Sequence, residues 1–228
     1  MNKSGGTGRA LGRRVLADTV HEEILAALLD GRYEPGASLS IDGLAREFDV
    51  SPTPVREALA RLESTGMVQR FALRGYRVAS LLQEEEFVDL MEARLAIEPV
   101  NSRLMATRRT EESLAALRAA VHDQATAQRG PSFAEFRDYY EADERFHQLI
   151  AQNSGNQFLL TAHNSLGGLV QRFRLFSGVG VTDADTAVPE HEAILAAIER
   201  GSAEDAEAAM AAHICLVRDR SISELRAH

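Results

Sequence analysis

Hydrophobic residues recur at helical spacing in three segments of the first 80 residues. The first segment ends at Gly31, the second begins after Ser40, and the third begins after Ser51 and ends near Gly66. Their apolar positions are Val20, Ile24, Leu25, Leu28 and Leu29, then Leu44, Ala45 and Phe48, then Val55, Leu59 and Leu62. The pattern therefore predicts three helices.

Two short strands, "MVQRF" and "GYRVA", follow the third predicted helix and are joined by a turn through "ALRG". Three short helices and a two-stranded ribbon are typical of a winged helix-turn-helix, in which the start of the second motif helix enters the major groove of DNA. Arg56 near that helix start could reach a guanine edge. Four further residues could hold phosphates: Arg46, Ser51, Thr53 and Arg70. A small helical domain with surface arginines is the alternative.

From Leu81 onward the strand signals disappear and about six amphipathic helices follow. Such a run is typical of an antiparallel bundle, so the predicted fold class is mainly α. The expected organisation is a flexible tail over 1–14, a DNA-binding domain over 15–80, and an effector-binding and dimerisation bundle over 81–228.

Three histidines of the predicted bundle have informative positions. His147 follows Asp143 by four residues, so both lie on one helix face. The chain rises about 15 Å from His191 to the turn at Gly201 and returns about 16 Å to His213, so these two imidazoles lie level in an antiparallel pair. Three histidines and a carboxylate suit a divalent cation, with zinc favoured over nickel or manganese. The alternative is that each is a solvated polar residue.

Charge and cysteine content narrow the function classes. The 228 residues carry a net charge of −9. Residues 1–80 hold 11 basic and 10 acidic residues, a net of +1, whereas residues 81–228 hold 14 and 24, a net of −10. DNA binding must therefore depend on local clustering in the first part. The single cysteine suits a reducing cytoplasm, and no apolar run reaches the roughly 18 residues needed to cross a membrane.

The segment "LAREFDVSPTPVREALARLESTGMVQR" resembles the signature of the GntR family of bacterial transcription regulators. The resemblance implies that Arg56 reads a guanine and that the wing tip, Arg74 and Gly75, approaches the minor groove. It also implies a homodimer that binds a palindromic double-stranded operator.

The segments "FHQLIAQNSGN" and "EHEAILAAIERGSAEDAEAAMAAHI" resemble the FCD effector domain of the FadR-type subgroup. The resemblance implies that Asp143, His147, His191 and His213 bind a metal and that a small carboxylate effector binds beside it. Arg94 is the implied carboxylate clamp, because a guanidinium binds both oxygens of a carboxylate; the alternative is a surface ion pair with Glu98. His163 and Arg172 are further candidates for the effector pocket.

Three functions compete. The favoured function is a transcription regulator, expected to be a repressor, whose DNA affinity is lowered by a small carboxylate effector. A metal-dependent hydrolase using metal-bound water is the second. A repressor that senses the metal itself is the third.

Overall fold

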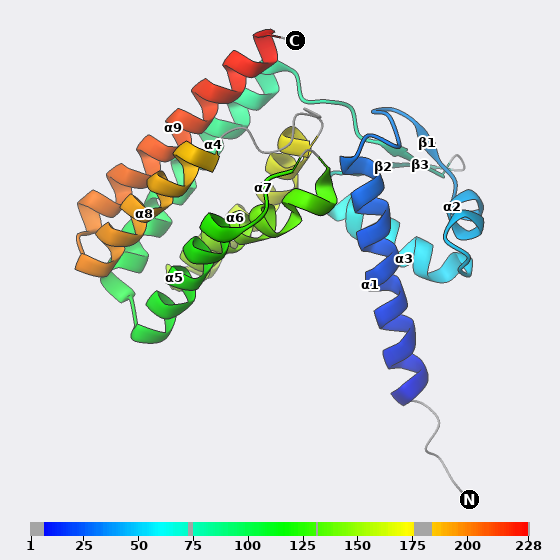
Figure 1. The fold of residues 1–228 in the computed structure, drawn as a ribbon, viewed down its shortest axis with the longest axis horizontal. Helices are drawn as coiled ribbons and strands as arrows, with labels where there is room; N and C mark the ends of the chain where they lie inside the picture. The colour runs from blue at the N-terminus through cyan, green and yellow to red at the C-terminus, as the bar shows by residue number, and fades with distance from the viewer. Residues whose placement is uncertain (1–6, 73–74, 131, 176–183, 228) are drawn as a thin grey trace, which may run out of the picture. The chain divides into compact units, whose positions relative to one another are not determined.

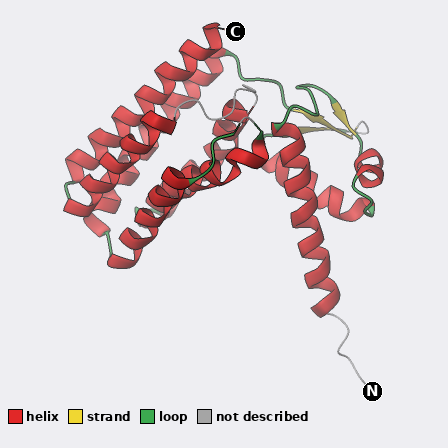
Figure 2. Ribbon diagram, viewed as in Figure 1, coloured by secondary structure: helices red, strands yellow, loops and turns green. Residues whose placement is uncertain are grey.

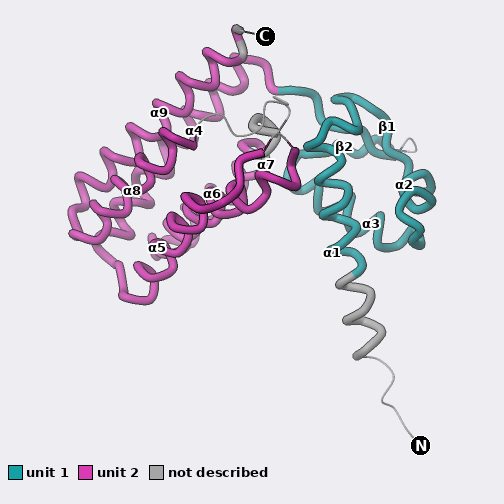
Figure 3. Tube along the Cα trace, viewed as in Figure 1, with its two compact units in different colours: residues 1–81, 171–178 teal, residues 82–170, 179–228 magenta. Residues whose placement is uncertain are grey.

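The structure is a computed structural model that describes residues 7–72, 75–130, 132–175 and 184–227. The side chains of residues 7–15, 168, 171–175, 225 and 227 lie outside the description. The chain forms two compact units (Figure 3): residues 1–81 with 171–178, and residues 82–170 with 179–228. The division after residue 81 lies one residue beyond the boundary that the sequence suggested.

The first unit contains three helices, α1 (Thr7–Leu29), α2 (Ile41–Glu47) and α3 (Pro52–Ser64). Ser40 is the N-cap of α2, and its hydroxyl accepts a hydrogen bond from the Gly43 N–H at 2.9 Å. The predicted apolar stripes face the core, where Ile24, Leu28, Val55 and Leu59 have no exposed surface. The helix α1 begins at Thr7, so it includes much of the segment 1–14 that we expected to be a flexible tail.

The predicted wing is present as strands β2 (Val68–Phe71) and β3 (Gly75–Val78), which pair antiparallel. The sheet has a third strand, β1 (Ser38–Leu39), so its order is β1-β3-β2 (Figure 2). A strand of two residues is too short to show an alternating pattern, which is why the sequence predicted a two-stranded ribbon. Gly75 opens β3 with a φ of 82°, a conformation that favours glycine.

The second unit is a bundle of six described helices, as predicted: α4 (Glu84–Arg108), α5 (Glu111–Thr126), α6 (Phe133–Asn153), α7 (Gln157–Leu175), α8 (Ala184–Arg200) and α9 (Ala203–Ala227). In Figure 1, α4 runs alongside α9 and α8. The helices α4 and α9 are antiparallel, as two ion pairs between them show: Glu84–Arg226 and Arg103–Glu207. None of the described helices is long and apolar enough to cross a membrane.

Candidate DNA-binding surface and metal centre

The predicted DNA-contacting residues lie on one helix-turn-helix and its wing. Arg56 is exposed in the second turn of α3, and Arg46 is exposed in the last turn of α2. Ser51 is the N-cap residue of α3, but its hydroxyl makes no capping hydrogen bond, which leaves it available for a phosphate. Thr53 and Arg70 are also exposed.

The wing adds one residue that the sequence did not single out. Arg77 is exposed on β3, and its guanidinium lies 5.3 Å from the centroid of the Phe71 ring. The alternation of strand β3, which buries Tyr76 and Val78 and exposes Arg77 between them, could have identified it. Arg74 lies outside the described residues.

The three predicted histidine ligands meet in the core of the bundle. His147 comes from α6, His191 from α8 and His213 from α9, and each offers a ligand atom within 4.8 Å of the others. The ring centroids of His191 and His213 are 4.6 Å apart, so the spacing prediction that they lie level is correct. All three are buried, with exposed fractions between 0% and 6%.

Each of these histidines has an oxygen neighbour at Nδ1. His147 Nδ1 lies 2.7 Å from Glu98 Oε2. His191 Nδ1 lies 2.7 Å from Gln124 Oε1, and His213 Nδ1 lies 2.7 Å from Glu190 Oε2. For His191 and His213, the oxygen acceptor at Nδ1 assigns the proton of a neutral imidazole to that nitrogen and leaves the lone pair on Nε2. The Nδ1 of His147 is close to Glu98 but is not aligned with it for a hydrogen bond.

Whether the three histidines can hold a cation depends on the ring nitrogens that remain for it. Nε2 of His191 and of His213 lie 3.3 Å apart, so in neutral rings two lone pairs face each other. Both ring nitrogens of His147 are buried, and neither has a hydrogen-bond partner among the described residues. Three buried imidazoles with ring nitrogens within 4.8 Å of one another are a ligand set for a borderline divalent cation, so the residues present fit a metal.

Asp143, the fourth predicted ligand, is buried and lies beside His191, but it is not among the residues whose ligand atoms lie within 4.8 Å of one another. Its Oδ1 is 3.8 Å from His191 Nε2 and accepts a hydrogen bond from Gln124 Nε2 at 3.0 Å. Gln124 therefore links Asp143 to His191, because its amide donates to the carboxylate and accepts from the ring. No sequence signal pointed to Gln124.

Arg94 forms the ion pair with Glu98 that was the alternative to a clamp, but the pair is buried. Nε of Arg94 lies 2.5 Å from Oε1 of Glu98, and Nη2 lies 3.2 Å from Oε2. Burial by itself raises the pKa of the Glu98 carboxyl, but the charge of Arg94, together with the contact with His147, holds that pKa well below its usual range. Glu98 is thus an ionised link between the predicted clamp and a predicted metal ligand.

A second series of contacts, from an arginine through a glutamate to a histidine, ends at His213. Arg220 donates to both oxygens of Glu190, at 2.6 and 3.1 Å, and Glu190 accepts from His213. Glu190 precedes His191 in the sequence, whereas Arg220 stands two helical turns after His213 and had no motif to mark it. Two arginines therefore orient the carboxylates that orient two histidines.

Two other residues were predicted to line the effector pocket. One of them, His163, lies close enough to the histidine centre for Glu98, His147 and Arg94 to affect its pKa. Burial lowers the pKa of His163, and Glu98 opposes that change. The side chain of Arg172 lies outside the described residues.

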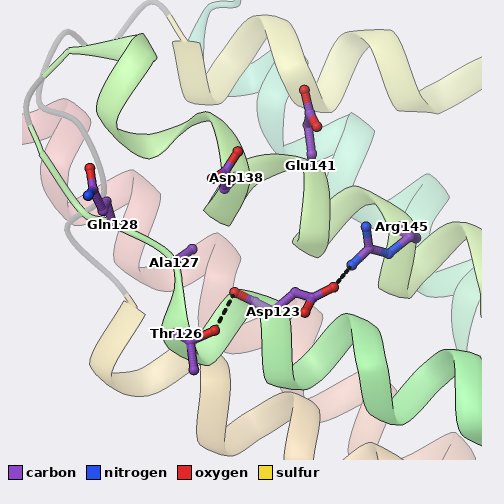
Figure 4. A pocket seen from close by; sticks show the side chains of 7 residues that line it. All are labelled: Asp123, Thr126, Ala127, Gln128, Asp138, Glu141 and Arg145. Atoms are coloured by element: carbon purple, nitrogen blue, oxygen red, sulfur yellow. Dashed lines mark hydrogen bonds and ion pairs between the residues drawn. The ribbon is translucent and has the colours of Figure 1, made fainter.

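A separate hollow of about 450 Å³ lies at the ends of α5 and α6 (Figure 4). Asp123 and Arg145 pair across its lining at 2.5 Å. Its lining residues are Asp123, Thr126, Ala127, Gln128, Asp138, Glu141 and Arg145. None of the predicted site residues lines it, so this hollow and the histidine centre are different places.

A winged helix-turn-helix followed by a helical bundle with a buried histidine centre defines a transcription regulator with an effector domain. The family model described as "Bacterial regulatory proteins, gntR family" matches residues 16–78, and the model described as "FCD domain" matches residues 89–215. The chain belongs to the GntR family of transcription regulators with an FCD domain. This membership confirms the resemblance and excludes the hydrolase hypothesis.

Similar proteins of known description or structure align with most of this chain. The HTH-type transcriptional regulator LutR of Bacillus subtilis is 30% identical over 83% of this chain and 94% of its own. The HTH-type transcriptional repressor RspR of Escherichia coli is 28% identical over 84% of this chain and 82% of its own. Among solved structures, E. coli McbR/YncC is 19% identical and covers 92% of this chain and 98% of its own with a TM-score of 0.72, which shows a shared fold.

Proposed function

We propose that this chain is a cytoplasmic, homodimeric repressor that binds a palindromic operator and releases it when a small carboxylate effector binds. Arg56 reads a guanine edge, and Arg46, Ser51, Thr53 and Arg70 hold phosphates, with Arg74 and Gly75 at the wing tip. The bundle holds a divalent metal, zinc in preference to nickel or manganese, through His147, His191 and His213, with Asp143 as the fourth ligand.

The observation that carries the metal proposal is the orientation of the three imidazoles. Every Nδ1 has an oxygen neighbour at 2.7 Å, and the Nε2 atoms of His191 and His213 lie 3.3 Å apart. An oxygen acceptor at the outer nitrogen of these two rings raises the basicity of the inner one. A bound divalent ion supplies positive charge that attracts a carboxylate.

The effector proposal is supported by the charge around the centre. Arg94 uses Nε and Nη2 for Glu98, and its Nη1 lies 3.9 Å from Met91 Sδ. The end of the guanidinium formed by Nη1 and Nη2 therefore retains donors for a ligand carboxylate. His163, with its lowered pKa, is a neutral neighbour that can share a hydrogen bond with the same ligand.

The test combines metal analysis with operator binding. Purified full-length protein is stripped with a chelator, reloaded with zinc, nickel or manganese, and titrated with its upstream promoter DNA and small carboxylates. We expect one metal per subunit by elemental analysis, and we expect a carboxylate to release DNA only from reloaded protein. Absence of bound metal after growth and after reloading would contradict the proposal.

One observation favours a metal-sensing repressor as the second candidate. The Nε and Nη2 atoms of Arg94 already bond to Glu98. The positive charge of the proposed clamp is therefore balanced by a carboxylate of the chain itself. Under this alternative, the metal alone changes DNA affinity. The same titration without any carboxylate distinguishes the two.

A further inference from the structure

The last turns of α4, α6 and α8 come together at one end of the bundle, where two consecutive arginines contact them. The last carbonyls of a helix have no N–H partner within that helix. Arg109 Nη1 donates to the Ala106 carbonyl of α4 at 2.7 Å, and its Nε donates to the Glu199 carbonyl of α8 at 3.2 Å. Arg108 Nη1 donates to the carbonyl of Ser154, the C-cap of α6. Both cations therefore lie where helix dipoles favour positive charge.

The turns after α6 and α8 leave space for these arginines. Gly155 follows α6 with a φ of 66°, and Gly201 follows α8 with a φ of 72°. A Cβ atom on Gly155 would lie 2.9 Å from Arg108 Nη1, and one on Gly201 would overlap the guanidinium of Arg109. Each glycine therefore allows both the left-handed conformation that ends a helix and the close approach of an arginine.

The helices that meet at this end carry parts of the histidine centre. His147 lies on α6, seven residues before Ser154, and His191 lies on α8, eight residues before Glu199. Glu98, the neighbour of His147 Nδ1, lies on α4 itself. Because the rise of a helix is fixed at about 1.5 Å per residue, holding its end sets the height of its histidine about 10–12 Å away.

We propose, on the basis of the proposed function, that Arg108 and Arg109 are positioning residues of the metal centre. They hold α6 and α8 at one height relative to α4, so that His147 and His191 reach the same cation. A metal site requires its donor atoms to be placed within about 0.5 Å. A hydrogen bond to a carbonyl has a defined length and direction, whereas the attraction between apolar side chains is non-directional.

The exposure of the two arginines makes the proposal testable. Arg108 and Arg109 lie about two helical turns from the histidines and are exposed, so the bundle should fold without either of them. Their removal should therefore change zinc affinity and the geometry of the site more than it changes folding. Circular dichroism of each variant checks that the helices are retained.

The experiment compares two arginines that contact the same residue of α8. Arg109 bonds to the Glu199 carbonyl, whereas Arg118 of α5 pairs with the Glu199 carboxylate at 2.5 Å. In a competitive chelator titration of full-length protein, Arg109→Met should weaken zinc binding by about tenfold. Arg118→Met should leave it unchanged. Arg108→Met gives an independent measurement at α6 and should also weaken zinc binding.

Two further measurements distinguish positioning from a general loss of stability. The visible absorption of bound Co²⁺ depends on the arrangement of its ligands, so Arg109→Met should shift these bands and Arg118→Met should not. Arg109→Lys keeps the charge but replaces the planar fork by one ammonium group, so it should restore zinc affinity only in part. Gly201→Ala should weaken zinc binding in the wild type and have less effect in Arg109→Met, because the methyl group acts by displacing that arginine.

The outcomes separate the two proposals. If both Arg108→Met and Arg109→Met match the wild type in zinc affinity and cobalt spectrum, the positioning role is overturned and the proposed function stays intact. An equal loss in Arg118→Met would also overturn it, because the loss would not depend on the carbonyl bond. If the wild type binds no metal after reloading, both proposals fail.

Discussion

Removing Arg94 should destabilise the bundle far more than removing a surface arginine. The side chains of Arg94 and Glu98 are only 3% and 6% exposed. In Arg94→Met, the Glu98 carboxylate stays buried without its strongest partner. Breaking a buried ion pair by removing one member typically costs about 3–5 kcal/mol. For a chain of this size that corresponds to a fall in Tm of roughly 6–20 °C.

A double-variant cycle isolates the pair. Glu98→Gln alone leaves a buried guanidinium without a counter-charge, whereas Arg94→Met/Glu98→Gln leaves neither charge. We expect the double variant to lose less than either single variant, because the penalty comes from the uncompensated charge. In the double variant, the amide introduced by Glu98→Gln would still offer an oxygen to His147 Nδ1.

The control is an exposed arginine–glutamate ion pair with the same N–O distance. Arg118 Nε lies 2.5 Å from Glu199 Oε1, but the two side chains are 49% and 35% exposed. Arg118→Met should cost less than about 1 kcal/mol. Urea unfolding of metal-free protein, followed by circular dichroism, measures all variants. An Arg94→Met loss no larger than that of Arg118→Met would refute the reasoning.

Four further predictions concern the metal, the DNA and pH. His213→Ala should lower the zinc content measured by elemental analysis and remove the rise in Tm on adding zinc; an unchanged zinc content would contradict this. Glu190→Gln should weaken zinc affinity about 10- to 100-fold in a competitive chelator titration, and wild-type affinity would rule out its orienting role. Arg56→Ala should abolish specific footprinting and leave the helical circular dichroism unchanged; a retained footprint would exclude the groove contact. Burial, then the charge of Arg61, lower the pKa of His21 to about 4 from 6.5, so the unfolded chain takes up the proton first and stability should fall as pH drops between these values. His21→Gln should remove that loss in Tm measurements and match the wild type above pH 7.

Sequence patterns predicted the elements and the positions of the histidines because both depend on helix periodicity. The equal distances from His191 and His213 to the turn at Gly201 required only the rise per residue. The strand β1 and the start of α1 at Thr7 were missed. Pairing of two residues with β3 depends on the tertiary fold, and Gly8 and Gly12 lower the helical propensity of the start of α1.

The residues that support the site could not be predicted in the same way. Glu98 was recognised as a neighbour of Arg94 at i+4, but the pattern does not say whether such a pair is exposed or buried. Gln124 of α5 contacts His191 of α8, and Arg220 of α9 contacts Glu190 of α8, so their roles depend on how the helices pack. Spacing within one helix or one hairpin is readable from sequence, whereas contacts between distant helices are not.

The contacts of Glu98 connect the two ligands of the proposed function. Glu98 holds Arg94 with both oxygens and His147 with one of them. Under the proposed function, an effector carboxylate would share Arg94 with Glu98, so effector binding would affect the group that orients a metal ligand. Any such coupling is reciprocal: a metal that raises effector affinity by a given factor has its own affinity raised equally. Since α4 carries both groups and only residues 79–83 separate it from β3, the helix that would sense the effector under this proposal follows the wing directly in the sequence.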